Sequence, residues 1–542
     1  MTLEERAATL TQSEIVALLE QNAALTRQVA WFKRQLFGRK SERRLLPVDA
    51  RQLALHGFGP AGDDLADSPP PPTETVRAYQ RRVQGASAAE AEDARELRFD
   101  ASVPLEVIRV PNPEAAGLTA AEYDVIDEKI TYRLAQRPGA YVILKYVRPV
   151  IKRKETGTLS CPPAPPAVLE RSFADVSVLA GLVVDKFRYH LPLYRQHQRL
   201  ADAGIMLSRA TLTQWVHRTA ALLEPIYHAL LSSILQSKVL AMDETPIKAG
   251  HRVKGKLHTG YFWPIYGDQD EVAFPFAASR AQAVVREALG GFCGVLLTDG
   301  YPVYERYAQQ VNGLVHAQCW SHARRQFVDA AQVEPALVAQ ALECIGQLYQ
   351  QEARGREQQL AEEALLTFRS EHAKPLVDAF FVWLARTLRE QILLPTNPFT
   401  KAARYALARE AALRVFLDYP TVPLDTNHLE REIRAIALGR RNWLFCWTEV
   451  GARYVGIVQS LIASCRLQGV DPYVYLVDVL QRIDTHPAFE VHLLTPRLWK
   501  LHIPELIEQR FQRKSSTHSK PRRAVISEEV EHGVQGALSS AT

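Results

Sequence analysis

The sequence predicts a multidomain α/β protein whose core carries a long helical insertion. Three observations predict this fold. Residues 238–331 alternate between short apolar runs and helix-forming segments, two of these runs end in an aspartate, and residues 332–416 are almost entirely helix-forming. The resulting order of three strands, helix, strand, helix, strand, helix is the ribonuclease H-like order. A chain of 542 residues is also too long for one ordinary domain, so we expect about three or four.

Composition and charge leave the partner open. Apolar residues make up 47% of the chain, which is typical of a protein that buries real cores. The net charge is only +5, so the total charge does not by itself indicate nucleic acid. Basic residues nevertheless cluster at residues 33–44, 148–154, 431–441 and 510–523. Each cluster is either a DNA-contacting surface or an ordinary solvated face.

Cysteine usage and the lack of targeting signals predict a soluble protein of a reducing compartment. The six cysteines are scattered rather than paired at regular spacings. The N-terminus lacks the basic-then-apolar order of a secretory signal, and no apolar run is long enough to span a membrane. We therefore expect a cytosolic location, no disulfides and no membrane contact.

Residues 1–57 are expected to form a dimerisation helix followed by a basic segment. Seam residues alternate by three and four positions, with an asparagine at one a position, where it fixes register and favours two strands; they are Ile15, Leu18, Asn22, Leu25, Val29, Phe32 and Leu36. The alternative is an ordinary amphipathic helix packed on its own domain. The basic segment after Gly38 suits DNA contact through Arg39, Lys40 and Arg43.

A linker and a small β-rich module are expected next. Residues 58–96 hold a run of prolines at 69–72, several acidic residues and an Ala-rich stretch, which is typical of a flexible linker. Residues 97–170 hold alternating, β-branched and aromatic segments, at 130–134 and 141–147, which predict strands.

Residues 171–235 are expected to be helical, with a DNA-binding-like pair of helices. The segment 193–203, a turn at Gly204 and a helix capped by Ser208 have helix-turn-helix spacing. In this interpretation Arg209, Thr213 and Gln214 face DNA. The alternative is a structural helical hairpin that contributes to the core.

The first part of the core, residues 236–331, is expected to hold strands at 239–242, 261–266, 272–276, 295–298 and 313–319. Pro264 and Pro275 restrict their two strands to an edge or a bulge. Helices are expected at 279–289, capped by Ser279, and at 301–309 and 321–331. The helical insertion is placed at 332–418, core completion and C-terminal helices at 419–485, and a basic, partly disordered tail at 486–542. In the completion, one helix is expected to break at Gly439 and another to begin with Pro472.

Three carboxylates carry the expected chemistry. Asp243 and Asp299 each end an apolar run, and Glu430 opens a basic, helix-forming stretch. The first and fourth strands are neighbours in the predicted sheet, so their ends share one edge, to which the helix of Glu430 returns across the insertion. Carboxylates placed in this way hold two divalent cations that act on a phosphodiester. We therefore expect an enzyme that cuts and joins DNA.

Other carboxylates compete for these roles. Glu244 points to the opposite face from Asp243 if the strand continues. Asp425 precedes a helix and is suited to cap it. The remaining competitors are Asp268, Asp270 and Glu432.

Nine short motifs carry a resemblance to a known family. They are Leu36-Phe-Gly-Arg-Lys-Ser-Glu-Arg, His190-Leu-Pro-Leu-Tyr-Arg-Gln, Leu212-Thr-Gln-Trp-Val, Ala241-Met-Asp-Glu-Thr, Thr298-Asp-Gly-Tyr, Cys319-Trp-Ser-His-Ala-Arg-Arg-Gln-Phe, Asn427-His-Leu-Glu-Arg, Gly439-Arg-Arg-Asn-Trp-Leu-Phe and Asp471-Pro-Tyr-Val-Tyr-Leu. In this order, over residues 15–485, the chain resembles insertion sequence sixty-six family transposases.

The resemblance implies a DNA transposase of the Asp-Asp-Glu type, encoded by a mobile insertion sequence. It assigns the catalytic and metal-binding roles to Asp243, Asp299 and Glu430, with two Mg²⁺ ions per active site and Mn²⁺ as a substitute. The implied reaction is strand cleavage at the element ends and strand transfer to target DNA. Expected partners are the terminal inverted repeats, target DNA, further copies of the chain in a homodimer or higher oligomer, and small companion proteins of the same element. The implied location is the bacterial cytosol, associated with the nucleoid.

One departure from the family concerns zinc. The family usually carries a zinc finger of two cysteine pairs before the segment that matches His190, whereas only Cys161 lies in that region here. A closed structural zinc site needs about four ligands. Zinc is therefore not expected, and the β-rich module is expected to be held by its β core alone.

A second metal-like spacing is formed by His316, Cys319 and His322, with Cys293 as a conceivable fourth ligand. We favour the alternative in which Cys319 packs in the core while His322 approaches the active edge. The same interpretation brings two further basic residues to that edge, Arg324 and Arg325.

Arginines near Glu430 are expected to clamp phosphates; they are Arg431, Arg434, Arg440 and Arg441. Trp443 and Trp447 either stack on bases or fill the core, and core is the default expectation.

Two rival functions stay open from the sequence. One is a dimeric DNA-binding regulator derived from a transposase and no longer catalytic, against which the presence of all three carboxylates argues. The other is a helical scaffold, which rests on the zipper and the insertion but does not explain acidic residues at strand ends.

Overall fold

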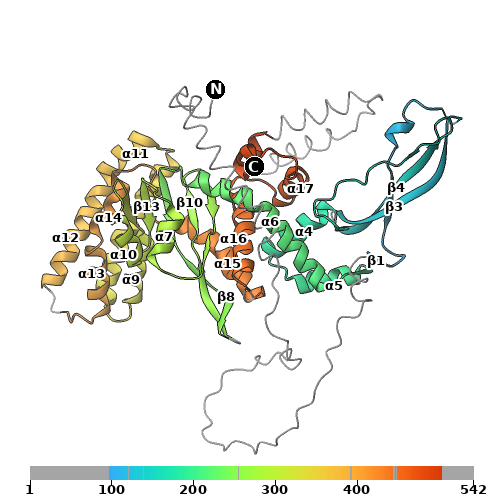
Figure 1. Cartoon of the computed structure of the whole chain (residues 1–542). Helices are drawn as coiled ribbons and strands as arrows, with labels where there is room; N and C mark the ends of the chain where they lie inside the picture. The colour runs from blue at the N-terminus through green and yellow to red at the C-terminus, as the bar shows by residue number, and fades with distance from the viewer. Residues whose placement is uncertain are drawn as a thin grey trace, which may run out of the picture.

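The computed structural model describes residues 97–502, apart from 120, 138, 254–255, 391–392, 444–445 and 447. The expected zipper at 15–36, the basic residues Arg39, Lys40 and Arg43, and the basic tail at 510–523 lie outside the described residues. Figure 1 shows a long β ribbon at one end of the molecule, the helical insertion at the other, and the main sheet between them.

The β-rich module is built on the hairpin of β3 (Tyr123–Arg137) and β4 (Ala140–Arg153). Three shorter strands accompany it: β1 (Arg98–Phe99), β2 (Leu105–Arg109) and β5 (Leu159–Ser160). Leu134 and Ile143 pair across the hairpin and are fully buried in the main core. The module is therefore β-rich as predicted, and its inner end is anchored by apolar packing. Cys161 is a half-buried free thiol.

Three helices follow: α4 (Val176–Phe187), α5 (Leu193–Asp202) and α6 (Arg209–Ile234). Gly204 makes the predicted turn with φ +77°, a backbone conformation that glycine adopts without steric cost. Ser208 caps α6 as predicted, because its side chain accepts the amide of Thr211. The short strand β6 (Ile205–Met206), which was not predicted, lies between the helices and pairs with β1.

The main sheet has five strands in the order β11, β10, β7, β13, β14. They are β7 (Val239–Met242), β10 (Ile265–Gly267), β11 (Glu271–Ala273), β13 (Val295–Thr298) and β14 (Val315–Gln318). β7, β13 and β14 run parallel, whereas β10 pairs antiparallel with both β7 and β11. Every residue of β7 and β13 is buried, as expected for strands covered on both faces.

Two predicted strands are each divided in the structure. The segments containing Pro264 and Pro275 were expected to be continuous strands, but each changes sheet at its proline. The pieces before Pro264 and after Pro275 form a second sheet, of β8 (Thr245–Val253), β9 (Lys256–Phe262) and β12 (Phe276–Ala277). A proline lacks the amide donor, so a ladder ends there at low cost. The β8–β9 hairpin, which projects from the body in Figure 1, was not predicted.

The helices of the core match the expected order. They are α7 (Gln282–Leu289), α8 (Pro302–Ala308) and α9 (Trp320–Asp329). The expected cap at Ser279 is wrong, because α7 starts later, with Ala281 at its N-cap and no side-chain cap. Ser279 Oγ instead accepts the Ala281 amide at 3.4 Å, two residues before the helix begins.

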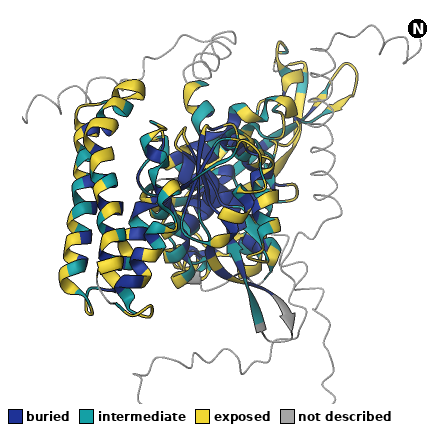
Figure 2. Cartoon of the chain, turned by 90° about the vertical axis from the view of Figure 1, so that its left-hand side faces the viewer, coloured by how far each residue is buried: buried dark blue, intermediate teal, exposed yellow. Residues whose placement is uncertain are grey.

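The insertion is helical, as predicted. It comprises α10 (Pro335–Glu357), α11 (Glu362–Phe368), η3 (Arg369–Ala373), α12 (Lys374–Glu390), α13 (Pro398–Leu407), α14 (Glu410–Arg414) and η4 (Val415–Leu417). Its core is aromatic: Phe380 contacts both Trp320 and Phe327, so the insertion packs directly on α9. Figure 2 shows buried residues concentrated around the central sheet, while the outer helices expose one side.

The chain ends in α15 (Asn427–Trp443), α16 (Glu449–Leu467), α17 (Pro472–Arg482) and η5 (Ala488–Leu494). The predicted break at Gly439 is wrong, because α15 continues through this buried glycine. α16 covers the edge strand β11: Ser460 and Ser464 accept the amides of Phe274 and Val272 at 2.8 and 3.1 Å. Pro472 lies in the first turn of α17, as predicted. Among the described residues, no helix is long and apolar enough to cross a membrane.

Candidate active site

Asp243 and Asp299 lie side by side at one edge of the main sheet. In the parallel pair of β7 and β13, Ala241 is opposite Leu297, and each aspartate follows two residues later. Both strands end just before their aspartate, so both carboxylates leave the sheet at its carboxyl edge, where ligand sites of α/β sheets are usually found. Both aspartates are half-buried. The predicted neighbourhood of the first and fourth strands is therefore present in the structure.

The electrostatics of Asp243 reflect this closeness. Burial, the negative charge of Asp299 and that of Glu244 each favour the protonated form, and the pKa of the Asp243 carboxyl is raised to about 7. The Glu244 amide, at 2.7 Å, and the charge of His322 act in the opposite direction. Because the two negative charges repel each other, a cation bound beside both carboxylates would relieve this repulsion.

Glu430 lies in the first turn of α15 and faces helix α9. Its Oε1 atom is 3.8 Å from Nε2 of His322, and both side chains are partly exposed, at 38% and 25%. The charge of His322 also opposes the rise in the pKa of Asp243. His322 therefore contacts the glutamate and is close enough to Asp243 for its charge to affect that carboxyl.

The start of α15 is fixed by the β14–α9 junction. The amide and hydroxyl of Thr426 both donate to Cys319 Sγ at 3.4 Å, and the Trp320 amide donates to Leu424 O at 2.9 Å. Cys319 and Trp320 are buried, at 2% and 1% exposure. The chain that leads to Glu430 is thus attached to the strand end next to Asp299, and Cys319 packs in the core as we favoured.

Each competing carboxylate is occupied by other groups. Glu244 is almost fully buried and accepts hydrogen bonds from Arg280 and from the Tyr304 hydroxyl. Asp425 accepts the Asn427 amide at the start of α15 and also the Tyr349 hydroxyl. The other three bind elsewhere: Asp268 to the Lys238 amide, Asp270 to the Tyr266 hydroxyl, and Glu432 to Arg466. Asp243 and Asp299 each accept one backbone amide through Oδ1.

The helical insertion supports the turn after Asp299. Asp299 Oδ1 accepts the Tyr301 amide at 2.9 Å, and Arg409 donates to Gly300 O at 3.2 Å. The Arg409 guanidinium also stacks on the Tyr405 ring, 3.9 Å from its centroid. A Cβ atom added to Gly300 would collide with the Tyr405 hydroxyl, so glycine is needed for this close approach.

The second metal-like spacing does not assemble. His316 Nε2 lies 2.9 Å from the Thr298 hydroxyl, and burial lowers the pKa of His316 to about 4. Cys293 is exposed and contacts the carbonyls of Gly291 and Asn312. Within the described part of the chain, no three His, Cys, Asp or Glu side chains are gathered closely enough to hold an ion. This holds for the carboxylate trio too.

The predicted DNA-contacting residues are distributed over several helices. Arg209 and Gln214 are exposed on α6, and Arg324 and Arg325 are exposed on α9. Arg431, Arg434 and Arg441 are exposed on α15, whereas Arg440 donates to Pro246 O at 2.6 Å and so ties α15 to the root of the β8–β9 hairpin. Trp447 lies outside the described residues, and the side chain of Trp443 is not described.

Sequence reasoning missed the groups that position the carboxylates. The Arg280–Glu244–Tyr304 contacts sit directly behind Asp243, and Tyr405 and Arg409 support Asp299 from an insertion predicted only as helical. No local motif predicts the contacts with the aspartate segments, because even the closest of these pairs, Glu244 and Arg280, is 36 positions apart.

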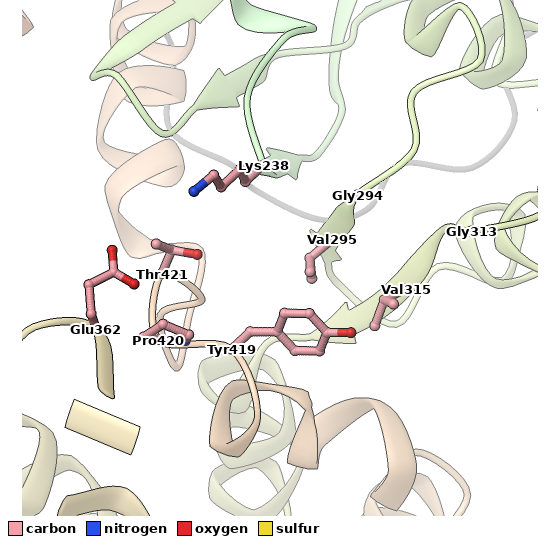
Figure 3. A pocket seen from close by; sticks show the side chains of 9 residues that line it. All are labelled: Lys238, Gly294, Val295, Gly313, Val315, Glu362, Tyr419, Pro420 and Thr421. Carbon is pink, nitrogen blue, oxygen red and sulfur yellow. The ribbon is translucent and has the colours of Figure 1, made fainter. Parts of the chain in front are cut away.

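A cavity of about 310 Å³ lies at the other end of the parallel strands (Figure 3). Lys238, Gly294 and Gly313, which precede β7, β13 and β14, line it together with Glu362 and Tyr419 of the insertion. Since the aspartates follow the carboxyl ends of β7 and β13, this cavity is separate from the carboxylate edge.

The chain matches family profiles of transposases. The profile "Transposase IS66 family" matches residues 171–454, which include all three carboxylates. The profiles "IS66 C-terminal element" and "Transposase C of IS166 homeodomain" match residues 460–496 and 24–110. The chain belongs to the IS66 family of transposases.

Two full-length relatives come from Sinorhizobium fredii (strain NBRC 101917 / NGR234). The uncharacterized protein y4jD is 30% identical over 88% of this chain and 94% of its own length. The uncharacterized protein y4hP is 28% identical over 88% of this chain and 89% of its own length. The similarity therefore spans the β-rich module, the core and the insertion together.

Proposed function

We propose that this protein is an Asp-Asp-Glu DNA transposase that cleaves DNA strands at element ends and joins them to target DNA. The observation that carries the proposal is the in-register placement of Asp243 and Asp299 at the ends of β7 and β13. Glu430 is the third member, brought to the same side by α15 and next to His322. Membership of the IS66 family agrees with the assignment.

The topology supports a ribonuclease H-like core. Its signature is a five-stranded sheet with the first strand central, the second and third on one side and the fourth and fifth on the other. The order β11, β10, β7, β13, β14 has this form when the β8–β9 hairpin is treated as an insertion after the first strand. The second core strand, β10, is antiparallel to its neighbours, as the same arrangement requires. The insertion α10–α14 then lies between the fifth strand and the acidic helix.

The residues at this edge fit divalent cations, and Mg²⁺ is the ion we propose, with Mn²⁺ as a substitute. The donors are carboxylate oxygens, which suit hard cations. The pKa of Asp243 is raised by burial and by the charge of Asp299, which supports a cation bound beside the two carboxyl groups. Asp243 and Asp299 would jointly hold two ions, with Glu430 completing one site. When bound, such ions lower the pKa of water and stabilise charge on a leaving phosphate oxygen.

The protein groups supply position and charge. Asp243 and Asp299 are held by strand register and by amide hydrogen bonds from Glu244 and Tyr301. His322 holds Glu430 at the edge, and the exposed arginines of α15 would bind phosphates on either side of the cut. Hydrolysis at the element end frees a 3′-hydroxyl, which then attacks target DNA in line without a covalent protein intermediate.

The test is cleavage of a duplex carrying the element's terminal inverted repeat, with and without Mg²⁺. Asp243→Asn, Asp299→Asn and Glu430→Gln should each abolish cleavage, while DNA binding stays within about twofold of wild type because phosphate contacts dominate affinity. Asp268→Asn is the matched control and should cut normally, since Asp268 lies at the opposite end of β7.

The outcomes separate the proposal from its rival. A wild-type protein that binds the repeat but never cuts it with Mg²⁺ or Mn²⁺ is a non-catalytic DNA-binding regulator. Cleavage by the Asp243→Asn variant would show that Asp243 is not a catalytic residue.

A further part of the proposal is dimerisation through the seam at residues 15–36. Polar substitutions of Leu18 and Leu25 should then yield a monomer in sedimentation.

A further inference from the structure

Two tyrosines at the α4–α5 turn are unusually exposed: Tyr189 lies on the turn itself and Tyr194 in the first turn of α5. Tyr189 is 69% exposed and Tyr194 is 55% exposed, more than any other aromatic residue in the described part of the chain except Phe489. Each ring has an arginine guanidinium over it: Arg188 lies 6.0 Å from the Tyr189 centroid, and Arg209 lies 5.8 Å from that of Tyr194. Aromatic rings paired with arginine are typical of recognition surfaces rather than of solvated ones.

The turn that presents these tyrosines is firmly built. His190, between them, has φ +56°, a left-handed conformation that costs a non-glycine residue energy and persists only where the surroundings impose it. The Leu191 amide donates to Asp185 O at 2.8 Å. Gln196 is fully buried and donates to Leu191 O at 2.9 Å. The exposure of the two rings is therefore a property of a fixed turn.

The surface around the rings is basic. Residues 185–202 contain four Lys or Arg residues, Lys186, Arg188, Arg195 and Arg199, against two acidic residues, Asp185 and Asp202. Asp185 is paired with Arg199. Such a surface repels basic partners and attracts a polyanion.

The same surface lies next to the helix of the proposed active site. Glu432 is two residues from Glu430 on α15, and burial raises its pKa while the charges of Arg466, Arg431 and Arg188 oppose that rise. Arg188 of the turn and Arg431 of α15 thus share one acidic neighbour. This shared neighbour indicates that the end of α4 lies near α15.

We propose that Tyr189 and Tyr194, with Arg188, Arg195 and Arg209, form a stacking surface for unpaired bases of DNA beside the cut. In a duplex the faces of the bases are covered by their neighbours, so exposed rings gain stacking energy only from bases that are unpaired. The arginines hold the backbone of the same strand. This assignment differs from duplex reading along α6, because it uses the turn and only the first residue of α6, Arg209, and does not involve Gln214.

The choice of DNA as the partner rests on the proposed function, but the test does not depend on cleavage. Binding is measured by fluorescence anisotropy on the full chain carrying Asp243→Asn, with chelator present. The probes are an oligothymidine of about 20 nucleotides and a random-sequence duplex of about equal length. A lost cleavage activity would disprove the proposed function and leave this measurement unchanged.

Tyr189→Ala and Tyr194→Ala should each weaken oligothymidine binding roughly tenfold, the typical value for one lost base stack, and change duplex binding less than about twofold. Tyr189→Phe and Tyr194→Phe keep the ring and should bind like wild type. Phe489→Ala, an equally exposed aromatic residue outside the surface, is the matched control and should have no effect.

Three results would overturn the proposal. Equal losses for the single strand and the duplex would make this a general phosphate-binding or duplex-reading face. Losses in the Phe variants as large as in the Ala variants would show that the hydroxyls, and not stacking, matter. Unchanged binding in both Ala variants, with circular dichroism confirming the fold, would show that this surface does not bind nucleic acid.

Discussion

Nε2 of His322 lies 3.8 Å from Oε1 of Glu430, and the charge of the same imidazole opposes the rise in the pKa of Asp243. His322 belongs to α9, which begins directly after β14, the strand beside β13. The glutamate that comes latest in the chain is therefore linked to the aspartates through one residue of the core. This contact is the reason for proposing Glu430 rather than Asp425 or Glu432, whose side chains have other partners.

Replacing His322 should therefore impair catalysis without unfolding the protein. His322→Gln removes the group that holds Glu430, and changes of this kind beside metal ligands typically cost about 10- to 100-fold in activity or metal affinity. Single-turnover cleavage as a function of Mg²⁺ concentration measures both quantities. Arg325→Gln, an exposed change on the same helix, serves as control for metal dependence. If His322→Gln leaves the Mg²⁺ dependence and the rate unchanged, His322 has no positioning role.

The sequence predicted those parts of the fold that depend on local pattern. Buried runs such as Val239–Met242 and Val295–Thr298 have apolar side chains at every position, and helix starts such as Ser208 and Asp471 carry a capping side chain. The aspartates were identified because each follows such a run directly. Their closeness then follows from strand order alone.

The missed features depend on contacts between distant residues. Pro264 and Pro275 were recognised as limits on a strand, but the pattern does not say that the chain changes sheet there. Gly439 has a low helix propensity, yet it is buried and α15 continues through it, so packing outweighs propensity. The His322–Glu430 contact joins residues 108 positions apart, as 430 − 322 shows. Only the three-dimensional arrangement brings them together.

The raised pKa of Asp243 predicts a stability that falls as pH rises. The folded pKa is about 7 against an ordinary value of 3.8, so between these values the folded state holds a proton that the unfolded state has lost. Stability is therefore lost from about pH 4 to about pH 7 and is constant above, with roughly 2–3 kcal/mol at stake after allowance for partial exposure.

Urea unfolding of the metal-free protein at several pH values measures this loss. Asp243→Asn, which carries no charge at any of these pH values, should flatten the profile and be more stable than wild type at pH 8. Adding Mg²⁺ should restore wild-type stability at pH 8 but not change the Asn variant by as much. An identical pH profile for the two proteins would contradict the assigned pKa.

Gly300→Ala should impair cleavage, because the added methyl group meets a side chain of the helical insertion. The new methyl group collides with the Tyr405 hydroxyl, so the turn that carries Asp299 has to move. A shift of about 1 Å near reacting groups costs on the order of 100-fold in rate. Cleavage should fall by about this factor while the unfolding midpoint changes little. The double variant Gly300→Ala with Tyr405→Ala removes the collision and should recover part of the activity; no recovery would show that the turn fails for another reason.

Arg369 should be the most sensitive residue of the insertion. It is 2% exposed and binds both carboxylate oxygens of Glu352 at 2.8 Å. Its remaining donors bind the carbonyls of Phe416, Tyr419 and Val422 at 2.6, 3.0 and 3.1 Å. These carbonyls belong to the segment that leads to α15, so Arg369 connects the stability of the insertion to the position of Glu430.

Removing one partner of a buried ion pair leaves the other charge uncompensated, which costs about 3–5 kcal/mol. Arg369→Met should incur this loss and also remove the guanidinium hydrogen bonds to these carbonyls, whereas Glu352→Gln keeps those bonds and should cost less. Denaturant unfolding ranks the two variants, and hydrogen exchange of residues 416–430 reports whether the segment before Glu430 loosens. Arg369→Lys should resemble Arg369→Met, because one ammonium group does not reach the carboxylate and the carbonyls together. If Glu352→Gln proves the more damaging change, the ion pair, and not the carbonyl contacts, holds this segment in place.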